Sequence, residues 1–565
     1  MSMLRKSLLA ASCALGLAGP AAAIHVNESF DGAWVDPSAA GNQKGLMVDY
    51  IPSANTFFFA FFTYDAAGEQ LWTVGSFQPE DGLREYTVPV SVVTGGRFSE
   101  EGTPSEAPIG TALVRLGCDA IDLDFTPGEG VPLTAASYRF QPSLGLDRLT
   151  AGECSSPADQ CPAGTTPEGE RCALPSSIPG NLVLTAGKDY VVNGRVTVEA
   201  GGKLSIAPGV TVIGGGSATA PNFIVVKAGG QIYANGTREQ PITFTGPEPV
   251  PGSWAGLVIA GRSICNDATP TQPCQFEAVP DITYGSATDP VLEDSSGVLR
   301  YVRILWAGQQ IAPDEELNGL TLLAVGSGTV LEHVQVDGGL DDGFELFGGT
   351  VNGRYLVCSN MGDDCFDFDQ GYRGKLQFGL GWQGSNPDQT SDSNGFETDN
   401  DSNNNDKQPR TEPMVANFTM VGRPSGTRDG MRIRRGAGGH YVNMVVTGYT
   451  RRCLNLDDAG TFALGTGTQQ GERLTMTHSF MGSCTGGTFD DAAGDPYPVS
   501  AWYAAGAGNQ SGDPVLDGFL PAAGSPVLEG GGVLADGFFQ PTTYRGAFGP
   551  GENWTKDWTV NLPGQ

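Results

Sequence analysis

The chain contains 565 residues, with 32 Lys and Arg against 63 Asp and Glu, and its formal net charge is −31. This acidity argues against a nucleic-acid partner, because contacts with phosphate groups need clustered Lys and Arg. The 82 Gly, 38 Pro and 39% hydrophobic residues are typical of a turn-rich β protein with a long core, and they argue against overall disorder.

Residues 1–23 have the regions of a secretory signal peptide. A basic pair precedes an apolar run over residues 7–17, and three alanines that end at Ala23 provide a cleavage site. We therefore expect cleavage near Ala23 and a secreted product, in the periplasm, on the cell surface or outside the cell. A lipoprotein cysteine at Cys13 is less favoured, because the better cleavage signal lies downstream. No later stretch has the roughly 18 apolar residues of a transmembrane helix, so we expect no transmembrane segment.

Ten of the eleven cysteines follow the signal peptide and fall into close sequential pairs. In an oxidising compartment such pairs predict local disulfides, although the sequence does not determine their connectivity. A zinc site is the alternative, but the chain has no C-x-x-C motif and its four histidines are scattered. The expected pairs are Cys118/Cys154, Cys161/Cys172, Cys265/Cys274, Cys358/Cys365 and Cys453/Cys484.

The region 24–153 reads as a small antiparallel β domain. The strand-like run Phe57–Tyr64 is followed by the Gly-containing turn Asp65–Gly68 and a further β-rich segment, which is a hairpin pattern. The Gly-x-Trp-x-x-Pro opening at Gly32–Pro37 and this hairpin resemble a small β module at the front of many secreted bacterial proteins. We expect its aromatic residues to form a core rather than a sugar-stacking platform.

A different pattern begins near residue 180. Residues 154–179 are rich in Ser, Pro, Gly and Glu and predict a linker, clipped by Cys161–Cys172. Short β runs separated by glycine turns then follow, and no helices of usable length lie between them, which predicts a β-solenoid. We expect this solenoid over residues 180–500 and a C-terminal capping segment over residues 501–565.

One heptapeptide pattern recurs five times, which indicates successive coils. In a strand, its fourth residue would share one face with its sixth, and the fifth would face the other side. The copies are Asp341–Phe347, Asp363–Asp369, Ser393–Asp399, Arg428–Arg434 and Arg451–Asp457. Stacking would form an inner ladder of Phe344, Phe366, Phe396, Met431 and Leu454 and an outward column of Glu345, Asp367, Glu397, Arg432 and Asn455.

The pattern of Gly202–Ile213 resembles the opening coil of right-handed parallel β-helix proteins. Further motifs resemble a widespread group of secreted bacterial β-helix proteins, known mainly from sequence; they lie at Asp341–Glu345, Phe366–Gly374, Asn394–Asp401, Tyr544–Gly549 and Asn553–Trp558. The resemblance covers roughly residues 180–565 and implies fold and secretion, but no established reaction. We expect an all-β chain: a right-handed parallel β-helix preceded by a small antiparallel β domain.

The outward column would stack like charges. Neighbouring strands lie about 4.8 Å apart, so each adjacent carboxylate pair costs roughly 3 kcal/mol at an effective dielectric near 20. Arg432 can pair with Glu397, and a Ca²⁺ ion could bridge Glu345 and Asp367, since it accepts six to eight oxygen ligands. Partial protonation or hydrated, splayed carboxylates are the alternative.

Two further acidic segments accompany this column. Oxygen donors alternate at Asp399, Asp401, Asn403 and Asn405 as in a calcium loop, although Arg410 occupies the place of the usual bidentate Glu. The calcium ligands that we predict are therefore Glu345, Asp367, Glu397, Asp399, Asp401 and Asn403. The pairs Asp341–Asp342 and Asp363–Asp364 lie at turns into strands, where Asp side chains commonly stabilise the turn.

Two classes of function remain. The favoured one is a calcium-stabilised protein of the cell surface or extracellular matrix that binds glycans or surfaces. The alternative is a polysaccharide lyase or glycoside hydrolase, with Glu345, Asp367, Glu397 and Arg432 as candidates, since β-helix lyases use carboxylate-bound Ca²⁺ with an Arg or Lys base. The short motifs of pectate lyases and polygalacturonases are absent, and so is a nucleophile-elbow serine. The partner that we expect is a polysaccharide or cell-surface glycan.

Overall fold

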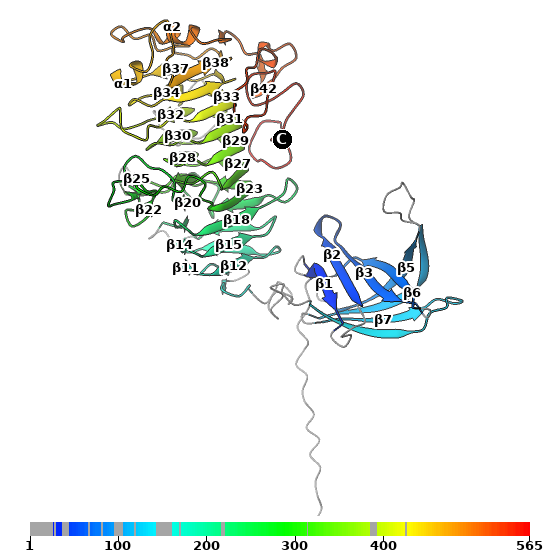
Figure 1. Cartoon of the computed structure of the whole chain (residues 1–565). Coiled ribbons are helices and arrows are strands. Elements are labelled where there is room, and N and C mark those ends of the chain that lie inside the picture. Colours follow the sequence, from blue (N-terminus) through cyan, green and yellow to red (C-terminus); the bar gives the residue numbers. More distant parts are fainter. Residues whose placement is uncertain are drawn as a thin grey trace, which may run out of the picture. The chain divides into compact units, whose positions relative to one another are not determined.

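The computed structural model describes residues 26–564 apart from short gaps, and the chain divides into two compact units, Met1–Cys161 and Pro162–Gln565 (Figure 1). The gaps cover residues 28–29, 37–43, 66–67, 81–82, 95–104, 118–119, 143–160, 169–170, 216–220, 313–314, 385–392 and 424–425. No helix in the described part of the chain is long and apolar enough to cross a membrane.

The first unit is an eight-stranded antiparallel barrel, in which β1 also pairs with β8. The inward side chains of β3 include Phe57, Phe59 and Phe61, which form the core together with Trp34. The predicted antiparallel domain is confirmed, and these aromatic residues lie inside it; Trp72, by contrast, is 59% exposed. The elements are β1 (Gly32–Val35), β2 (Gly45–Ile51), η2 (Pro52–Ala54), β3 (Thr56–Tyr64), β4 (Gln70–Phe77), β5 (Glu85–Thr94), β6 (Ser105–Leu116), β7 (Ile121–Pro127) and β8 (Ala136–Pro142).

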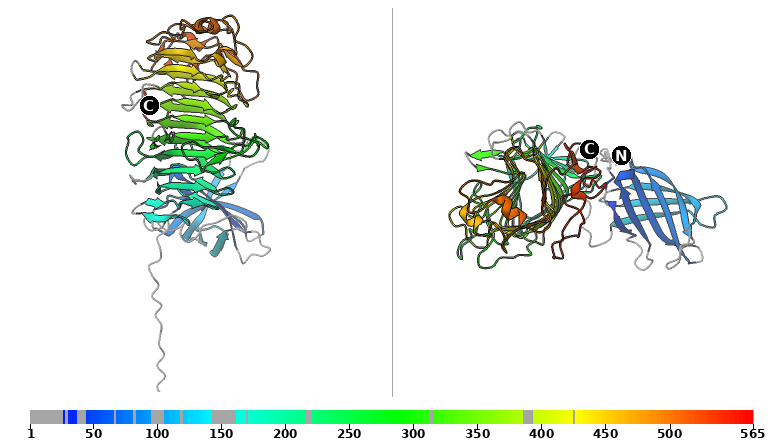
Figure 2. Two further views of the ribbon diagram at one scale, coloured as in Figure 1. Left: turned by 90° about the vertical axis from the view of Figure 1, so that its left-hand side faces the viewer. Right: turned by 90° about the horizontal axis from the view of Figure 1, so that it is seen from above.

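The second unit is a parallel β-helix whose coils contribute strands to a large sheet and a ten-stranded sheet (Figure 2). The large sheet contains β9 (Thr166–Glu168), β10 (Arg171–Ala173), β12 (Asn181–Leu184), β13 (Asp189–Val192), β15 (Lys203–Ile206), β16 (Thr211–Gly214), β18 (Gln231–Asn235), β19 (Ile242–Thr245), β23 (Gly297–Leu305), β27 (Val330–Asp337), β29 (Asn352–Ser359), β31 (Lys375–Trp382), β33 (Met414–Val421), β35 (Gly439–Val442), β36 (Val445–Thr447), β38 (Leu474–Thr477), β39 (Phe480–Met481) and β40 (Gln510–Ser511). The predicted β-helix is confirmed.

The ten-stranded sheet contains β11 (Ser177–Ile178), β14 (Arg195–Val198), β17 (Phe223–Val226), β20 (Gly256–Ala260), β26 (Leu320–Leu323), β28 (Phe344–Phe347), β30 (Phe366–Asp369), β32 (Phe396–Thr398), β34 (Asp429–Ile433) and β37 (Arg452–Leu456). Smaller elements are β21 (Cys274–Gln275), β22 (Thr283–Tyr284), β24 (Gln310–Ala312), β25 (Glu315–Glu316), β41 (Leu516–Asp517), β42 (Leu520–Pro521), α1 (Ala459–Phe462), α2 (Val499–Ala504) and η3 (Pro526–Leu528). Because β10 and β11 pair with β13 and β14, part of the expected linker belongs to the β-helix. These strands of two or three residues are too short to show a periodic pattern.

The register of the ten-stranded sheet is the one that the heptapeptide predicts. Phe344 pairs with Phe366, Phe366 with Phe396, and the same column continues through Met431 and Leu454. The three phenylalanine rings stack nearly parallel inside the helix, with centroid distances of 5.0 and 5.2 Å. Each such pair contributes about 0.5–1.5 kcal/mol beyond the burial of its apolar surface, so the ladder also stabilises the register.

A bend divides each long strand of the large sheet at one residue with left-handed backbone geometry. Non-glycine residues in this conformation cost about 1–3 kcal/mol each, and Asn tolerates it best. The column contains Tyr301, His333, Tyr355, Phe378, Asn417, Asn443 and His478, with φ between 48° and 62°. The first four positions therefore carry rings where a smaller amide would fit with less strain.

Residues 513–564 form what we term the C-terminal strap. α2 and β40 lie at the C-terminal end of the β-helix, and the strap runs back along the large sheet (Figures 1 and 2). Gln335, Gln377 and Asn443 each donate to a strap carbonyl and accept from a strap N–H, at Val560, Gln540 and Gly532 respectively. These side chains are buried, and the strap supplies the N–H groups from which their amide oxygens accept.

The disulfides follow the predicted pairing wherever the structure describes it. Bonds join Cys265 to Cys274, Cys358 to Cys365 and Cys453 to Cys484. Cys161 and Cys172 are also disulfide-bonded, whereas Cys118 and Cys154 lie outside the described residues.

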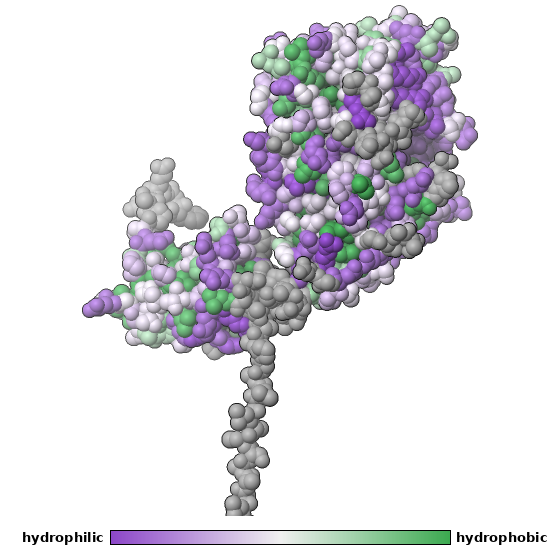
Figure 3. Space-filling view, turned by 180° about the vertical axis from the view of Figure 1, so that it is seen from behind, coloured by the Kyte–Doolittle hydropathy of each residue, from purple (hydrophilic) through white to green (hydrophobic). Residues whose placement is uncertain are grey.

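The β-helix surface in Figure 3 mixes hydrophilic and apolar residues.

We predict that Gln377→Leu loosens the strap without unfolding the β-helix. The change removes both hydrogen bonds that hold the backbone of Gln540, and each typically contributes about 0.5–1.5 kcal/mol. Limited proteolysis with mass spectrometry should show faster cleavage within residues 530–545 than in the wild type. Gln272→Leu, at an exposed glutamine, is the control, and equal cleavage in both variants would contradict the anchoring role.

Candidate functional site

The outward column of the ten-stranded sheet is present as predicted. Glu345 pairs in register with Asp367, Asp367 with Glu397, and Glu397 with Arg432. Earlier coils place Val258 and Thr321 in the same column. The column therefore changes from apolar to acidic along the helix axis, and the acidic part is the candidate site.

This part of the sheet is largely covered. Glu397 is 8% exposed, and Glu345 and Asp367 are half-buried. Residues 261–296, between β20 and β23, fold over the preceding apolar part of the column, where Cys265 and Cys274 belong to a buried cluster with Val258. The sequence did not indicate this cover, because the insertion lies far from the acidic residues along the chain.

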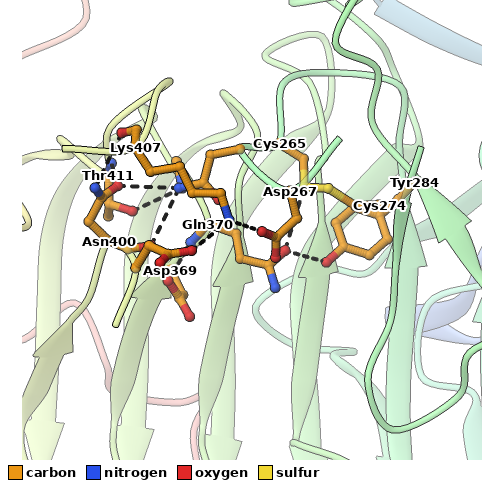
Figure 4. The surroundings of a disulfide bond; sticks show 12 residues. Cys265, Asp267, Cys274, Tyr284, Asp369, Gln370, Asn400, Lys407 and Thr411 are labelled. Carbon is orange, nitrogen blue, oxygen red and sulfur yellow. Dashed lines mark hydrogen bonds and ion pairs between the residues drawn. A yellow bond between two sulfur atoms is a disulfide. The ribbon is translucent and has the colours of Figure 1, made fainter. Parts of the chain in front are cut away.

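The insertion meets the loop 399–411 beside Asp369 (Figure 4). Asn266 donates through its side chain to the side-chain oxygen of Asn400 at 3.2 Å, and Lys407 forms an ion pair with Asp267. The Tyr284 hydroxyl donates to the side chain of Gln370 at 2.6 Å. Two segments distant in sequence thus close one side of the acidic column.

A ladder of side chains supports the turn that leads into this sheet. Asp342 accepts a hydrogen bond from the backbone N–H of Asp364 at 2.7 Å, and Asp364 accepts from the N–H of Asn394. The side chain of Asn394 accepts from the backbone N–H of Asp429 at 3.1 Å, and the side chain of Asp429 accepts from the backbone N–H of Arg452 at 3.1 Å. Each side chain therefore binds the equivalent residue of the next coil, which explains why the repeat carries Asp or Asn here.

Two overlapping groups of carboxylates lie at the first acidic coils. The first group contains Asp341, Asp342 and Asp363, and the second contains Asp342, Glu345 and Asp367. Within each group, one carboxylate oxygen of each residue lies within 4.8 Å of those of the other two residues. We term these five residues the acidic cluster. Within the described part of the chain, Asp342, Glu345 and Asp367 form no ion pair, and Oδ1 of Asp367 is buried without a hydrogen-bond partner.

Electrostatics penalise full ionisation of this cluster. Burial raises the pKa of Asp342, Glu345 and Asp367 well above the usual range, and neighbouring carboxylates raise it further. The donor set consists of oxygens alone, which is the chemistry that Ca²⁺ prefers. The buried, unpaired oxygen of Asp367 also fits a cation ligand.

The next coils neutralise their acids with arginine. Glu397 pairs with Arg432 at 3.4 Å, as predicted, and also with Arg434. Asp399 pairs with Arg434 and Arg435, both at 2.7 Å. Although burial lowers the pKa of Arg434, the hydrogen bond and charges of Asp399 and Glu397 raise it above its usual value. This guanidinium holds its proton firmly and is therefore a poor general base.

The loop that we expected to bind calcium is held by internal contacts. Oδ1 of Asp401 accepts from the N–H groups of Asn403 and Asn404 at 2.8 and 2.7 Å, and Oδ2 pairs with Lys407 at 2.5 Å. Arg410 is buried and donates to the carbonyl of Asn405 at 2.8 Å. Asp399 and Asp401 thus bind different cationic side chains, and a calcium ion in this loop stays a prediction.

The family of pectate-lyase-like β-helix domains matches residues 176–514. The chain belongs to this family. No curated protein and no solved structure matches it. The match begins near β11 and ends close to β40, so it covers the β-helix with the acidic column and leaves most of the strap outside.

In this pectate-lyase-like β-helix, the sequence pattern missed several residues of the site. Asn318 donates to Glu345 and precedes β26, which pairs with β28 as one further coil of the same sheet. The segment Asn318–Leu322 is a degenerate copy of the heptapeptide, with Asn, Gly and Leu at matching positions. Asp342 also joins both carboxylate groups, although it was not among the calcium ligands that we predicted.

We predict that Arg434→Met destabilises the protein more than Arg432→Met. Arg434 contacts both Glu397 and Asp399, so its loss leaves two buried carboxylates short of a partner and should cost about 3–5 kcal/mol. Arg432 contacts Glu397 and the more exposed Asp457, so its loss should cost less. Chemical denaturation should give this order, and a larger effect for Arg432→Met would contradict it.

We also predict a pH dependence in metal-free buffer. Burial, helped by the charge of Asp399, raises the pKa of Asp369 to about 8. The folded state therefore keeps a proton that the unfolded chain loses near pH 4, and this stabilisation disappears as the pH rises from about 4 through 8. The melting temperature should fall over this interval in chelator. Asp369→Asn cannot titrate and should show a shallower fall, whereas equal slopes would contradict the assignment.

Proposed function

We propose that this chain is an exported, calcium-stabilised β-helix protein that binds glycans at the cell surface or in the extracellular matrix. Membership of a family described as pectate-lyase-like supports a carbohydrate-related role. The signal-peptide pattern of residues 1–23 and the three local disulfides of the β-helix support export, because such bonds persist in oxidising compartments.

The acidic cluster is the observation that carries the calcium proposal. Two oxygens that bind one Ca²⁺ lie at most about 5 Å apart, since each Ca–O distance is about 2.3–2.6 Å. The oxygens of Asp342, Glu345 and Asp367 lie within 4.8 Å of one another and meet this limit. Asp341 and Asp363 supply further oxygens next to Asp342. A bound Ca²⁺ would supply the positive charge that arginine supplies one coil later at Glu397.

The geometry favours binding over catalysis. The arginines beside the column are engaged by Glu397, Asp399 and Asp457, which makes them poor bases for a lyase reaction. Glu345 and Asp367 bring oxygens within 4.8 Å, closer than the roughly 6.5–9.5 Å that separates the carboxyl groups of an inverting glycosidase. A retaining enzyme has its carboxyl groups about 5–5.5 Å apart but needs one of them ionised as the nucleophile, whereas burial raises the pKa of both groups here. A structural cation site uses the same carboxylates without requiring a free base.

Calcium should therefore raise the stability of the wild type. A ligand that binds only the folded state stabilises it by about 2.7 kcal/mol at 100 times its Kd. Melting curves in EGTA and in millimolar CaCl₂ should separate clearly for the wild type and less for Asp367→Asn. In EGTA the variant should be at least as stable as the wild type, because one buried like charge is removed.

The control is Asp289→Asn, at an exposed aspartate of the 261–296 insertion, which should keep the full calcium response. A wild type that melts at the same temperature in EGTA and CaCl₂ would refute the calcium site. Incubation with neutral and uronic polysaccharides, with pull-down and product analysis, tests the rest. Retention without products is expected, whereas calcium-dependent unsaturated products or new reducing ends would establish the enzyme alternative.

A further inference from the structure

A pocket of about 530 Å³ lies between the large sheet and the C-terminal strap. Tyr355 of β29 and Phe378 of β31 form its wall on the sheet side, and Tyr544 and Trp554 form its wall on the strap side. This volume lies within the range of small-molecule sites, about 300–1,000 Å³, which are mostly lined by aromatic and apolar groups with a few polar ones. The acidic column belongs to the other sheet, so the pocket is a separate feature.

The aromatic wall is held rigidly by its neighbours. Tyr301, His333, Tyr355 and Phe378 stack in successive coils, with centroid distances of 4.4, 4.4 and 5.1 Å. Trp554 stands edge-on to Tyr355 at 5.3 Å, and its indole N–H donates to the carbonyl of Ala547 at 2.8 Å. The rings therefore need little reorganisation to receive a ligand, which lowers the entropic cost of binding.

The two rings on the sheet side of the pocket belong to a column with strained backbone geometry. Tyr355 and Phe378 adopt left-handed geometry, with φ of 57° and 62°. The next two coils place Asn417 and Asn443 at the equivalent position, where the conformation causes less strain. Tyr301 and His333 share this geometry outside the pocket, so the strain belongs to the whole stacked ring column. Tyr355 and Phe378 are the members of that column that line the pocket.

The polar groups of the pocket define the class of ligand. Glu552 and Gln540 are exposed at the pocket, and Asn553 is half-buried beside them. A pyranose ring presents an apolar C–H face and a hydroxyl-bearing edge, which match an aromatic wall and a rim of carboxylate and amide groups. The carboxylate of Glu552 and the net charge of −31 disfavour a uronate and favour an uncharged sugar ring.

We propose that this pocket binds a neutral hexopyranose unit of a polysaccharide, with one face of the sugar ring against the aromatic wall and its hydroxyl groups bonded to Glu552 and the neighbouring amides. This inference rests on the proposed glycan-binding function and assigns it a place and a sugar class.

The test measures binding of neutral hexasaccharides by isothermal titration calorimetry with the full-length mature protein. Cellohexaose, mannohexaose and laminarihexaose are the probes, and hexagalacturonate is the charged comparison. Tyr355→Asn should weaken the binding of a neutral probe about tenfold or more, because it removes part of the aromatic lining of the pocket. Asn fits the left-handed backbone, so this variant should fold, and melting curves verify that it does.

Tyr301→Asn is the matched control, since Tyr301 has the same residue type, a φ of 48° and a place in the same stack, but does not line the pocket. It should bind like the wild type. Glu552→Gln should also weaken binding severalfold. Because Glu552 is exposed and lies outside the ring stack, this second test is unaffected by any change in the stacking of the rings.

The outcomes separate the pocket from the proposed function. If the wild type binds a neutral probe and both pocket variants bind equally well, the pocket assignment is refuted while glycan binding stands. If only hexagalacturonate binds, the sugar class is refuted. If no probe binds, the pocket assignment fails, and retention of polymers in the pull-down decides separately whether glycan binding survives.

Discussion

The stacking of equivalent residues in successive coils is the constraint on which the rest of this structure depends. In a parallel β-helix each side chain lies beside its counterpart one strand away, at about 4.8 Å. A position repeated in the sequence therefore meets copies of itself. An apolar repeat gains contacts from this arrangement, as in the Phe344, Phe366 and Phe396 ladder, whereas an acidic repeat adds repulsion with every coil.

The protein resolves this constraint differently in each column. The Asp and Asn residues at the turn use their side chains to bind the backbone of the next coil, so repetition becomes a source of hydrogen bonds. In the outward column, Arg432 of β34 follows the run of acidic residues and pairs with Glu397. Arg434, directly after β34, neutralises both Glu397 and Asp399. At Asp342, Glu345 and Asp367 the chain provides no described ion pair, and the charge balance there depends on protons or a bound cation.

The sequence predicted what the repeat controls. The heptapeptide specified the order of β28, β30, β32, β34 and β37, which residues stack inside and which face outwards, and the pairing of Glu397 with Arg432. It could not predict the cover over the acidic column, because Asn266 and Asn400 meet only after several coils have been stacked. The pocket beside Tyr355 was equally hidden, since its walls combine β29 and β31 with a strap almost 200 positions later in the numbering.

The strap changes the character of the β-helix. A solenoid in which each coil touches only its neighbours unfolds gradually from its ends, as a one-dimensional array does. Here contacts of the strap reach from His478 back to Arg238, and they join coils that are otherwise independent. The amide anchors at Gln335, Gln377 and Asn443 occur at fixed coils. Inserting or deleting one coil between two of them would therefore shift the anchors on one side out of register with the strap. The strap, which lies outside the repeats, thus fits only one number of coils between its anchors.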